Sequence, residues 1–496
     1  MQKIFQNPSD LEKLAKAQYA VPQFLMMENA ARGLADFILD FTPESVLILC
    51  GKGNNGGDGY AVARLLQDKC EVTILKTEEP TAEEARAQYE MCKRLGYVIP
   101  VLDTGICTTL SSKDCRVKPD NDKFIILDCI YGTGFHGELP ASIKELLDTA
   151  NKSKAIKIAC DIPSGLYFHA DYTITMGCQK LALYSDKAKA VCGKIIVQDL
   201  GISREKFENA VVECPQSGCI ETTTYLIDAT DITLPYRKNR AAHKGTYGHT
   251  AVFCGEKSGA AILAATAAMN TGSGLTTLIK ASDKSDLSQF KISPSLMLSD
   301  SIPKKTTCIA AGSGFTQFSE NVAKQISDWF KSQKTPAAVF DAGFITAPEF
   351  PALLKELNSC TGARIILTPH LAEFSSLVKN LTGEECSVSE LAENPQKKIE
   401  LGKIINKEFP QVALIIKSAN TFIADNGETF IIADGSQSLA KGGSGDILAG
   451  MTASLLAQGY SAKDAAITAA YHHAQTAAQL GQDAYNLTPE TLLANI

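Results

Sequence analysis

Short apolar runs of Val, Ile and Leu alternate with helix-length amphipathic segments along most of this chain. In the first half the runs cover residues 46–50, 72–75, 124–129 and 156–160. Aliphatic and β-branched runs of this length are typical of parallel strands that helices bury on both faces. The first half therefore predicts an α/β fold with a Rossmann-like parallel sheet, whose ligand crevice lies at the carboxyl ends of the strands.

A polar segment, ECPQSGCIETTT at residues 213–224, interrupts this rhythm, and a new glycine-rich α/β pattern begins near Thr246. Further strands are expected at residues 251–254, 309–311, 338–340, 365–367 and 412–416. A chain of 496 residues is too long for one ordinary core. Because no internal repeat relates the halves, we expect two unlike domains, residues 1–215 and residues 225–496.

Charge and composition narrow the partners. The formal net charge is −7 and charged residues make up 21% of the chain, so no electrostatic footprint for nucleic acid or an anionic membrane is present. No stretch approaches the ~18 uncharged apolar residues of a membrane span, and the first ten residues resemble no targeting peptide. We expect a cytoplasmic protein. The 15 cysteines lack a CxxC pair and predict buried thiols, with Cys214 and Cys219 idle.

The first candidate site begins at GKGNNGGDGY, residues 51–60, which follows a predicted strand and precedes a helical pattern. Residues 51–56 formally satisfy GxGxxG, in which glycines let backbone N–H groups approach a pyrophosphate at a helix N-terminus. Asp58 would repel a phosphate. A carboxylate at this position therefore indicates catalysis or a bound cation.

Two further predicted strands end in oxygen-bearing side chains: Asp128 in LDCIYGTG, and Asp161 and Ser164 in DIPSG. If these strands are neighbours, Asn55, Asp128 and Ser164 converge and offer ligands suited to a hard cation. Each residue taken singly could be an ordinary turn former. Three such turns at three successive strand ends favour a site.

The second candidate site is SLAKGGSGDILAGMTASLLAQG, residues 438–459. A glycine-rich turn precedes a predicted helix, so free N–H groups can form an anion hole for a transferring phosphoryl group. Asp446, expected at the first helical position, can take a proton from an attacking hydroxyl, although it could also be only a helix cap. His370 and Glu373 follow one predicted strand, and Lys417 ends another.

The motifs of the first half resemble the NAD(P)HX epimerase family, also called the YjeF N-terminal domain, over residues 1–215. The motifs are MMENAARG at 26–33, GxGNNGGDG, D(x)3GTG and DIPSG, in this order. The resemblance implies exchange of the R and S forms of hydrated NADH and NADPH, with K⁺ held by Asn55, Asp128 and Ser164. Asp128 or Asp161 would act as acid and base, and the sequence leaves this choice open. Substrate contacts are implied at Asn54, Asn55, Gly56, Gly57, Asp58, Gly132, Thr133, Gly134, Phe135, His136, Gly137, Glu138 and Asp161. Lys52 stands where the family usually has Pro.

The motifs of residues 225–496 resemble the ADP- or ATP-dependent NAD(P)HX dehydratase family, which has a ribokinase-like α/β fold. The resemblance implies that Asp446 deprotonates the ring hydroxyl of the S hydrate, that ADP or ATP with Mg²⁺ phosphorylates it, and that departing phosphate restores the double bond. Substrate contacts are implied at Ala260, Gly314, His370 and Asp446, and nucleotide contacts at Lys417, Ser418, Ala419, Asn420, Thr421 and Gly445. The chain departs from the family at DAGFI (341–345, usually DADAL), Lys441 (usually Thr) and Ser436 (usually Asn).

A rival interpretation is a small-alcohol kinase of ribokinase type fused to a nucleotide-binding sensor domain. GGSGD supports phosphoryl transfer to any small alcohol, and GxGxxG-like turns bind as readily as they react. Only the pairing of the two domains favours cofactor repair. Two remaining features carry smaller expectations. His472 and His473 lie in an apolar helix and are expected to pack, and the apolar helix at 24–39 is expected to serve a homo-oligomer interface.

Overall fold

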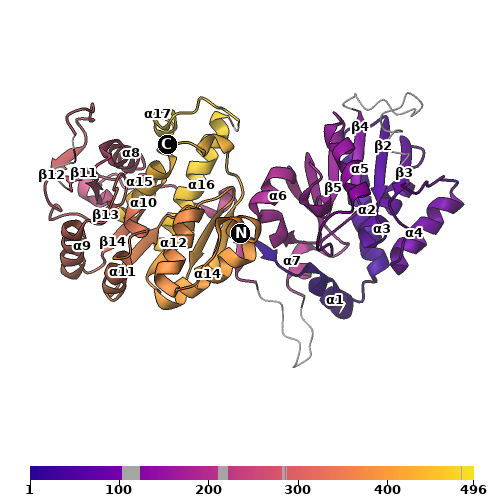
Figure 1. The fold of residues 1–496 in the computed structure, drawn as a ribbon, viewed down its shortest axis with the longest axis horizontal. Coiled ribbons are helices and arrows are strands. Elements are labelled where there is room, and N and C mark those ends of the chain that lie inside the picture. The colour runs from indigo at the N-terminus through magenta and orange to yellow at the C-terminus, as the bar shows by residue number, and fades with distance from the viewer. Residues whose placement is uncertain (103–122, 211–221, 282–284, 286, 482) are drawn as a thin grey trace. The chain divides into compact units, whose positions relative to one another are not determined.

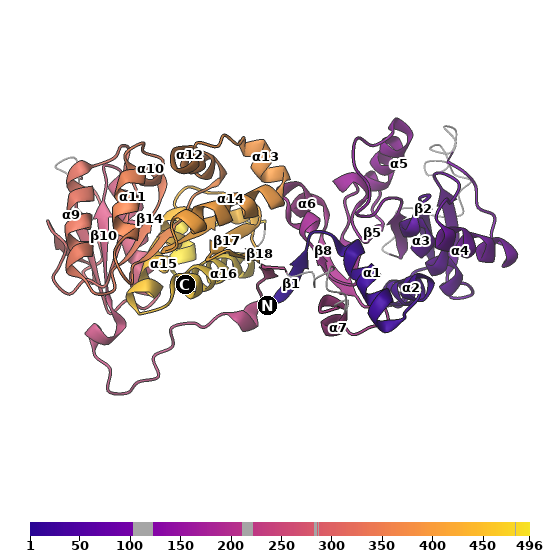
Figure 2. The same cartoon turned by 90° about the horizontal axis from the view of Figure 1, so that it is seen from below.

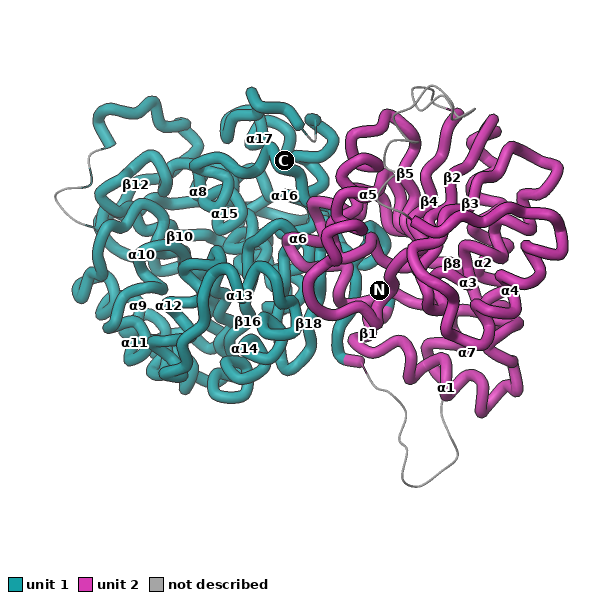
Figure 3. The backbone as a smooth tube through the Cα atoms, turned by 45° about the vertical axis from the view of Figure 1, so that its right-hand side comes forward, with its two compact units in different colours: residues 1–2, 223–496 teal, residues 3–222 magenta. Residues whose placement is uncertain are grey.

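A computed structural model describes residues 1–102, 123–210, 222–281, 285, 287–481 and 483–496. These residues form two compact units, which we call unit 1 (residues 1–2 and 223–496) and unit 2 (residues 3–222) (Figure 3). Cys214, Cys219 and most of the polar segment at 213–224 lie outside the described residues. Each unit is described by itself below.

Unit 2 is built around a parallel six-stranded sheet with the order β3-β2-β4-β5-β6-β8 (Figure 1). Its strands are β2 (Ser45–Cys50), β3 (Glu71–Lys76), β4 (Phe124–Cys129), β5 (Ile156–Cys160), β6 (Tyr172–Met176) and β8 (Lys194–Gln198). Its helices are α1 (Pro8–Tyr19), α2 (Gln23–Leu39), α3 (Asn54–Leu65), α4 (Glu83–Arg94), α5 (Ala141–Lys152), α6 (Asp186–Val191) and α7 (Arg204–Glu208). Beside the main sheet, β1 (Gln2–Phe5) pairs in parallel with β7 (Gln179–Lys180). The predicted α/β class and parallel sheet are confirmed.

Alternate residues of the central strands bury opposite faces of this sheet. Ile48 belongs to a core with Leu34 of α2 and Tyr60 of α3, whereas its neighbour Leu49 belongs to a core with Leu146 of α5. The strands therefore read as continuous apolar runs, because every residue meets a helix on one side or the other.

The polar turns of unit 2 meet at one edge of the sheet. The chain leaves β2 for β3 on one side and returns to β4 on the other, so the strand order reverses between β2 and β4. A crevice opens at the carboxyl ends of the strands at such a reversal. The turn after β2, the end of β4 and the turn after β5 all lie there.

Unit 1 has a mixed sheet with the order β12-β11-β10-β13-β14-β15-β16-β17-β18-β9 (Figure 2). The strands are β9 (Thr224–Leu226), β10 (His249–Cys254), β11 (Leu275–Lys280), β12 (Met297–Ser299), β13 (Cys308–Ala311), β14 (Ala337–Phe340), β15 (Arg364–Leu367), β16 (Val412–Ile416), β17 (Thr421–Asp425) and β18 (Glu428–Ile432). The helices are α8 (Ser258–Asn270), α9 (Glu320–Ser332), α10 (Ala342–Ile345), α11 (Phe350–Asn358), α12 (Leu371–Thr382), α13 (Val388–Glu393), α14 (Pro395–Glu408), α15 (Ser444–Ala457), α16 (Ala462–Leu480) and α17 (Pro489–Leu493). The antiparallel pairing of β17 with β16 and β18 was not predicted.

Most of the described cysteines are buried, and the apolar residues of helix α2 face the core. Nine of the described cysteines are buried and unpaired, whereas Cys70 and Cys360 are half-buried and unpaired. Helix α2 turns Met26, Leu34 and Ile38 into the core of unit 2, so its apolarity needs no partner chain to explain it. Among the described residues, no helix is both long and apolar enough to cross a membrane.

Helices α8 and α15 pack unusually closely, because small residues face each other. Ala261, Ala264 and Ala265 of α8 are completely buried. A Cβ atom added at Gly450 of α15 would lie 2.0 Å from the carbonyl oxygen of Ala264. Because that oxygen belongs to the backbone, neither helix can give way cheaply. The contact fixes the position of α15 and of the glycine-rich turn before it.

We expect Gly450→Ala to destabilise unit 1, because the methyl group would push α8 and α15 apart; overpacking of this kind costs about 1–3 kcal/mol. Urea unfolding monitored by circular dichroism measures the change. The matched control is Gly435→Ala in the same unit, whose added Cβ would meet its nearest atom, the carbonyl oxygen of Ala419, at an ordinary 3.4 Å. Equal stability of the two variants would contradict the packing argument.

Candidate functional site

Asp128 and Ser164 form a buried hydrogen-bonded pair at the predicted site of unit 2. Asp128 is completely buried at the end of β4. Its Oδ1 accepts from Ser164 Oγ at 2.7 Å and from Ile130 N at 3.1 Å, and its Oδ2 accepts from Ser164 N at 2.8 Å. Ser164 Oγ in turn accepts from Tyr131 N at 2.9 Å. Both carboxylate oxygens of Asp128 are therefore occupied by donors.

Burial raises the pKa of Asp128 to about 6, and the hydrogen bonds from Ser164 and Ile130 oppose that rise. A positive charge held near this carboxyl group would lower the pKa again. A bound cation would therefore favour the ionised form of Asp128.

Asn55 lies in the first turn of α3, next to Gly132 of the turn after β4. Its Oδ1 and Nδ2 atoms are buried and have no hydrogen-bond partner among the described residues. A Cβ atom added at Gly132 would lie 3.7 Å from Asn55 Cγ and 3.1 Å from Asp161 Oδ2, so Gly132 sits between these two side chains. A buried amide without a partner is costly unless a ligand completes it. Together with Asp128 and Ser164, its oxygen provides a donor set that fits a hard monovalent cation.

Asp161 stands at a left-handed backbone position, with φ of 70°, directly after β5. Its Oδ1 accepts from Met176 N at 3.3 Å and from Thr175 Oγ1 at 3.4 Å, and it forms an ion pair with Lys180. From the residues that the structure describes, Oδ2 accepts one long bond, 3.4 Å, from Thr133 N. One oxygen is fixed within the fold and the other faces the turn that starts at Gly132.

The remaining residues predicted to bind the epimerase substrate divide into two groups. Asn54 and Asp58 line a cavity of about 70 Å³ together with Glu12 and Met26, and burial raises the pKa of both Asp58 and Glu12. The residues on the exposed part of the 132–138 turn are Gly134, His136, Gly137 and Glu138. Between them, Phe135 stacks on Tyr131 with ring centroids 4.2 Å apart.

Close packing restricts the position of Gly56 to glycine. A Cβ atom at Gly56 would lie 1.9 Å from the carbonyl oxygen of Gly51, and one at Gly57 would lie 2.7 Å from Met27 Cε. Lys52, at the position where Pro is usual in the family that the first half resembles, pairs with Glu78 at 2.9 Å and is exposed. It is held by that pair and not by the buried cluster.

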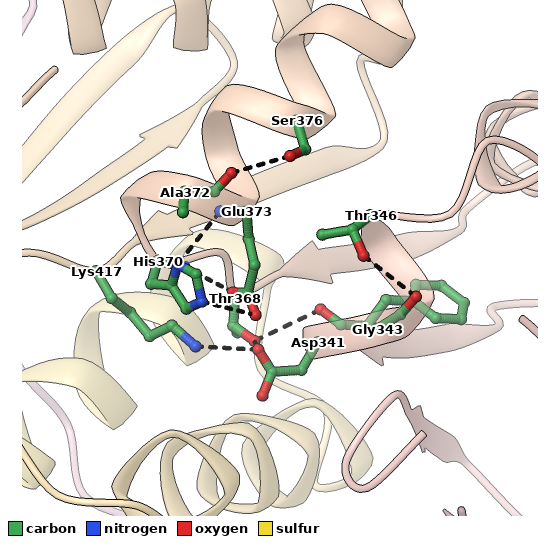
Figure 4. Close-up of polar contacts among 10 residues, drawn as sticks. Asp341, Gly343, Thr346, Thr368, His370, Ala372, Glu373, Ser376 and Lys417 are labelled. Carbon is green, nitrogen blue, oxygen red and sulfur yellow. Dashed lines mark hydrogen bonds and ion pairs between the residues drawn. The ribbon is translucent and has the colours of Figure 1, made fainter. Parts of the chain in front are cut away.

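In unit 1 the loops after neighbouring strands also converge (Figure 4). Lys417 Nζ lies 3.0 Å from Asp341 Oδ1, which also accepts from Thr368 Oγ1 at 2.7 Å. Burial lowers the pKa of Lys417, but the charges of Asp341 and Glu373 outweigh burial and raise it. Lys417 therefore stays charged and holds Asp341 in place.

Asp446 projects toward this cluster from the third residue of α15, not from the first as predicted, because the helix begins at Ser444. A Cβ atom added at the preceding Gly445 would lie 3.3 Å from Lys417 Nζ and 4.0 Å from Asp341 Oδ2. Burial and the negative charge of Asp341 raise the pKa of Asp446 to about 6, while Ser313 and Lys417 lower it. Its surroundings give it an electrostatic role beyond that of a cap.

The other predicted residues of unit 1 lie in three separate places. A Cβ atom added at Gly314 would lie 3.4 Å from Ala260 Cβ, so the loop after β13 touches the first turn of α8. His370 caps α12 through a reciprocal pair of bonds with Glu373 and leaves its ring half-exposed. The residues after Lys417 form the turn into β17, where Ser418 Oγ donates to the carbonyl oxygen of Asn420 at 2.8 Å. Ala419 belongs to this turn and Thr421 begins the strand.

Sequence reasoning missed Asp341, Lys180 and Glu12 as site residues. Asp341 follows β14 directly, as Asp161 follows β5, so the rule applied in unit 2 could have found it. His473 was expected only to pack. It is buried, which lowers its pKa to about 4, and its Nε2 also lies 3.5 Å from Ser444 Oγ at the start of α15.

Comparison with known proteins covers both units. Residues 24–182 match the family described as YjeF-related protein N-terminus, and residues 250–496 match the NAD(P)H-hydrate dehydratase family. The bifunctional NAD(P)H-hydrate repair enzyme Nnr of Helicobacter pylori is 34% identical over 508 residues, which covers 100% of this chain and 99% of the relative. The chain belongs to the family of bifunctional NAD(P)H-hydrate repair enzymes. Both resemblances recognised in the sequence are confirmed.

Single-domain relatives match each unit of this repair enzyme separately. NAD(P)H-hydrate epimerase of Rhodopirellula baltica is 33% identical over 214 residues, 40% of this chain and 84% of the relative. The ADP/ATP-dependent NAD(P)H-hydrate dehydratase of Bacillus subtilis, co-crystallised with ATP and Mg²⁺, is 28% identical, with a TM-score of 0.42, and covers 53% of this chain and 91% of that chain.

We expect Gly132→Ala to impair epimerisation, because its methyl group would lie only 3.1 Å from Asp161 Oδ2 and press on that oxygen. A misplacement of this order near reacting groups costs up to about 100-fold in rate. The matched variant is Gly134→Ala in the same turn, whose added Cβ meets no atom within 4 Å. Steady-state kinetics on R and S hydrates should show the larger loss of kcat in Gly132→Ala, and the reverse order would contradict this geometry.

Proposed function

We propose that this enzyme repairs hydrated NADH and NADPH in two steps. Unit 2 interconverts the R and S hydrates, and unit 1 dehydrates the S hydrate at the expense of ADP or ATP. The observation that carries this conclusion is the end-to-end match with a bifunctional relative, which spans both units. The rival pairing of a small-alcohol kinase with a sensor domain does not account for that match.

In unit 2 the pattern of hydrogen bonds distinguishes the two aspartates. Asp128 has donors on both oxygens and no exposure, so it is placed to hold a cation and not to exchange protons. Asp161 presents Oδ2 to the turn at Gly132 with one long bond only. Epimerisation by ring opening, or by loss and return of water, requires a proton to be taken up and given back at the hydrated carbon. We assign that proton to Asp161 Oδ2.

Asn55, Asp128 and Ser164 would hold K⁺ in unit 2. The unpartnered amide of Asn55 and the raised pKa of Asp128 support this proposal. A bound K⁺ supplies a fixed positive charge beside the substrate. The same three residues then hold the turn after β5 against the end of β4, so that Asp161 faces the crevice.

In unit 1 Asp446 would act as the base. Its pKa of about 6 leaves it ionised at neutral pH, so it can accept the proton of the ring hydroxyl. The hydroxyl oxygen then forms a bond to the terminal phosphorus of ADP or ATP as the bond from that phosphorus to the bridging oxygen breaks and AMP or ADP leaves. N–H groups at the start of α15 stabilise the transferring phosphoryl group. The new phosphate leaves with the C–O electron pair, a proton leaves the neighbouring carbon, and the double bond returns.

Nucleotide binding in unit 1 is proposed for Lys417, the following turn and Gly445. Mg²⁺ would arrive with the nucleotide phosphates, and Asp341, whose Oδ2 faces Gly445, is a carboxylate placed to contact it. Mg²⁺ supplies charge neutralisation for the phosphates. Lys417 meanwhile orients Asp341 through the ion pair between them. The cytoplasmic location and the homo-oligomeric state remain predictions.

We expect the wild-type chain to restore NADH absorbance from the S hydrate only when ADP or ATP is added. Asp446→Asn should lower this rate by about 100-fold or more, since the base is lost, while epimerisation persists. In the wild type, kcat for dehydration should fall as the pH drops through about 6, because protonation of Asp446 removes the base. Absorbance at 340 nm measures the first step, and chromatographic separation of the hydrates measures the second.

Absence of dehydration with both nucleotides would contradict the assignment of unit 1. Loss of epimerisation in Asp446→Asn would contradict the independence of the two sites.

We expect K⁺ to stabilise unit 2 more at pH 7.5 than at pH 5, because protonation of Asp128 at the lower pH removes a charged ligand. A K⁺ concentration about 30-fold above its Kd stabilises by about 2 kcal/mol. Thermal unfolding in KCl and in LiCl of equal ionic strength measures the difference, and Asn55→Ala should abolish it. An unchanged K⁺ effect in Asn55→Ala would contradict the proposed ligand set.

A further inference from the structure

Lys180 is a buried cation that the mechanism above leaves unused. It ends β7, which pairs with β1, and only 2% of its surface is exposed. Its ammonium group forms an ion pair with Asp161 Oδ1. A buried ammonium group costs several kcal/mol of desolvation unless a carboxylate compensates it. Asp161 provides this compensation, so Lys180 and Asp161 depend on each other at the site.

The contacts of Asp161 are divided between its two oxygens. Lys180, Thr175 Oγ1 and Met176 N all contact Oδ1. Oδ2 is left for Thr133 N, at 3.4 Å, and for the space at Gly132. Because three donors hold one oxygen, the carboxyl group cannot rotate freely, and the other oxygen stays directed at the crevice. A cation in contact with a carboxylate also favours its ionised form.

Three further titratable groups face Lys180 from separate elements. They are Glu12 of α1, Asp58 of α3 and Cys160 of β5, and each of them interacts electrostatically with its ammonium group. Burial raises the pKa of all three groups, although for Cys160 the hydrogen bond with Cys129 contributes more. Asp161 is the partner in direct contact with the ammonium group.

We propose that Lys180 is a positioning residue for epimerisation, which fixes Asp161 Oδ1 and maintains the ionised carboxylate so that Oδ2 can accept the proton of the substrate. This inference rests on the proposed function of unit 2. Lys180 acts through Asp161 and does not itself touch the substrate.

The positive charge of Lys180 is lost at high pH. Burial lowers the pKa of Lys180 to about 8, against the opposing charges of Glu12, Cys160 and Asp58. Lys180 is charged below this value and loses its proton as the pH rises through it. Epimerisation by the wild type should therefore decline above a pH of about 8, because Asp161 then loses its cationic partner.

The test compares Lys180→Met and Lys180→Arg with a control in the full-length enzyme. Lys180→Met should lower kcat for epimerisation by about 10- to 100-fold with little change in KM, and should move the acidic limb of the pH profile to higher pH. Lys180→Arg should recover much of kcat and extend activity above pH 8, because guanidinium stays charged there. The control is Lys194→Met on the exposed start of β8, which should leave both limbs unchanged.

The possible results separate the proposed function of unit 2 from the proposed role of Lys180. A wild type that does not epimerise overturns the proposed function, whatever the variants do. A wild type that epimerises alongside a Lys180→Met enzyme with kcat within twofold and an unshifted profile overturns only the role of Lys180. If Lys180→Met fails to fold, judged by circular dichroism, Lys180→Arg decides through its alkaline limb. A wild-type kcat that is flat from pH 7 to 10 overturns the proposal without any variant.

Discussion

Burial of parallel strands on both faces leaves their carboxyl ends as the natural place where polar side chains can gather. In both units of this repair enzyme the strand order reverses, between β2 and β4 in unit 2 and between β10 and β13 in unit 1. Turns after the parallel strands carry most of the acids, amides and glycines of the two clusters. The rest of each unit supports this arrangement: apolar helices cover the faces, and small residues allow close approach where a loop must enter the crevice.

The aspartates in these crevices differ in the groups that contact them, although they share the same side chain. Asp128, Asp161 and Asp446 are all acids near strand or helix ends, yet their surroundings differ. Asp128 is buried and accepts hydrogen bonds on both oxygens. Asp161 has close partners on Oδ1 and one long bond on Oδ2. Burial and the charge of Asp341 raise the pKa of Asp446. The distinct surroundings suit a cation ligand, a proton carrier and a base that is ionised at neutral pH. Lys417 and Lys180 make the corresponding ion pairs, with Asp341 and Asp161.

The ion pairs Lys180–Asp161 and Lys417–Asp341 have the same arrangement. Each joins a lysine at the end of one strand to an aspartate that directly follows another, and each aspartate accepts a hydroxyl hydrogen bond on the same oxygen. The carboxylate is thereby fixed, because rotation would break several contacts together. Glycines complete the arrangement: Gly132 lies against Asp161 and Gly445 lies against Asp341, where any larger residue would fill the space.

The sequence by itself determined the α/β class, the placement of the nine predicted strands and the residues of both glycine-rich turns. These features are local, because strand periodicity and turn chemistry depend on neighbours along the chain. It left open which aspartate of unit 2 carries the proton, misplaced Asp446 by two positions in its helix, and did not identify Lys180, Glu12 or Asp341. Only the tertiary structure gave the position of Asp446 in its helix and the contacts of Lys180, Glu12 and Asp341. Our proposal that Asp161 carries the proton also rests on contacts with residues from other elements. A carboxylate's role depends on which of its oxygens those distant partners occupy.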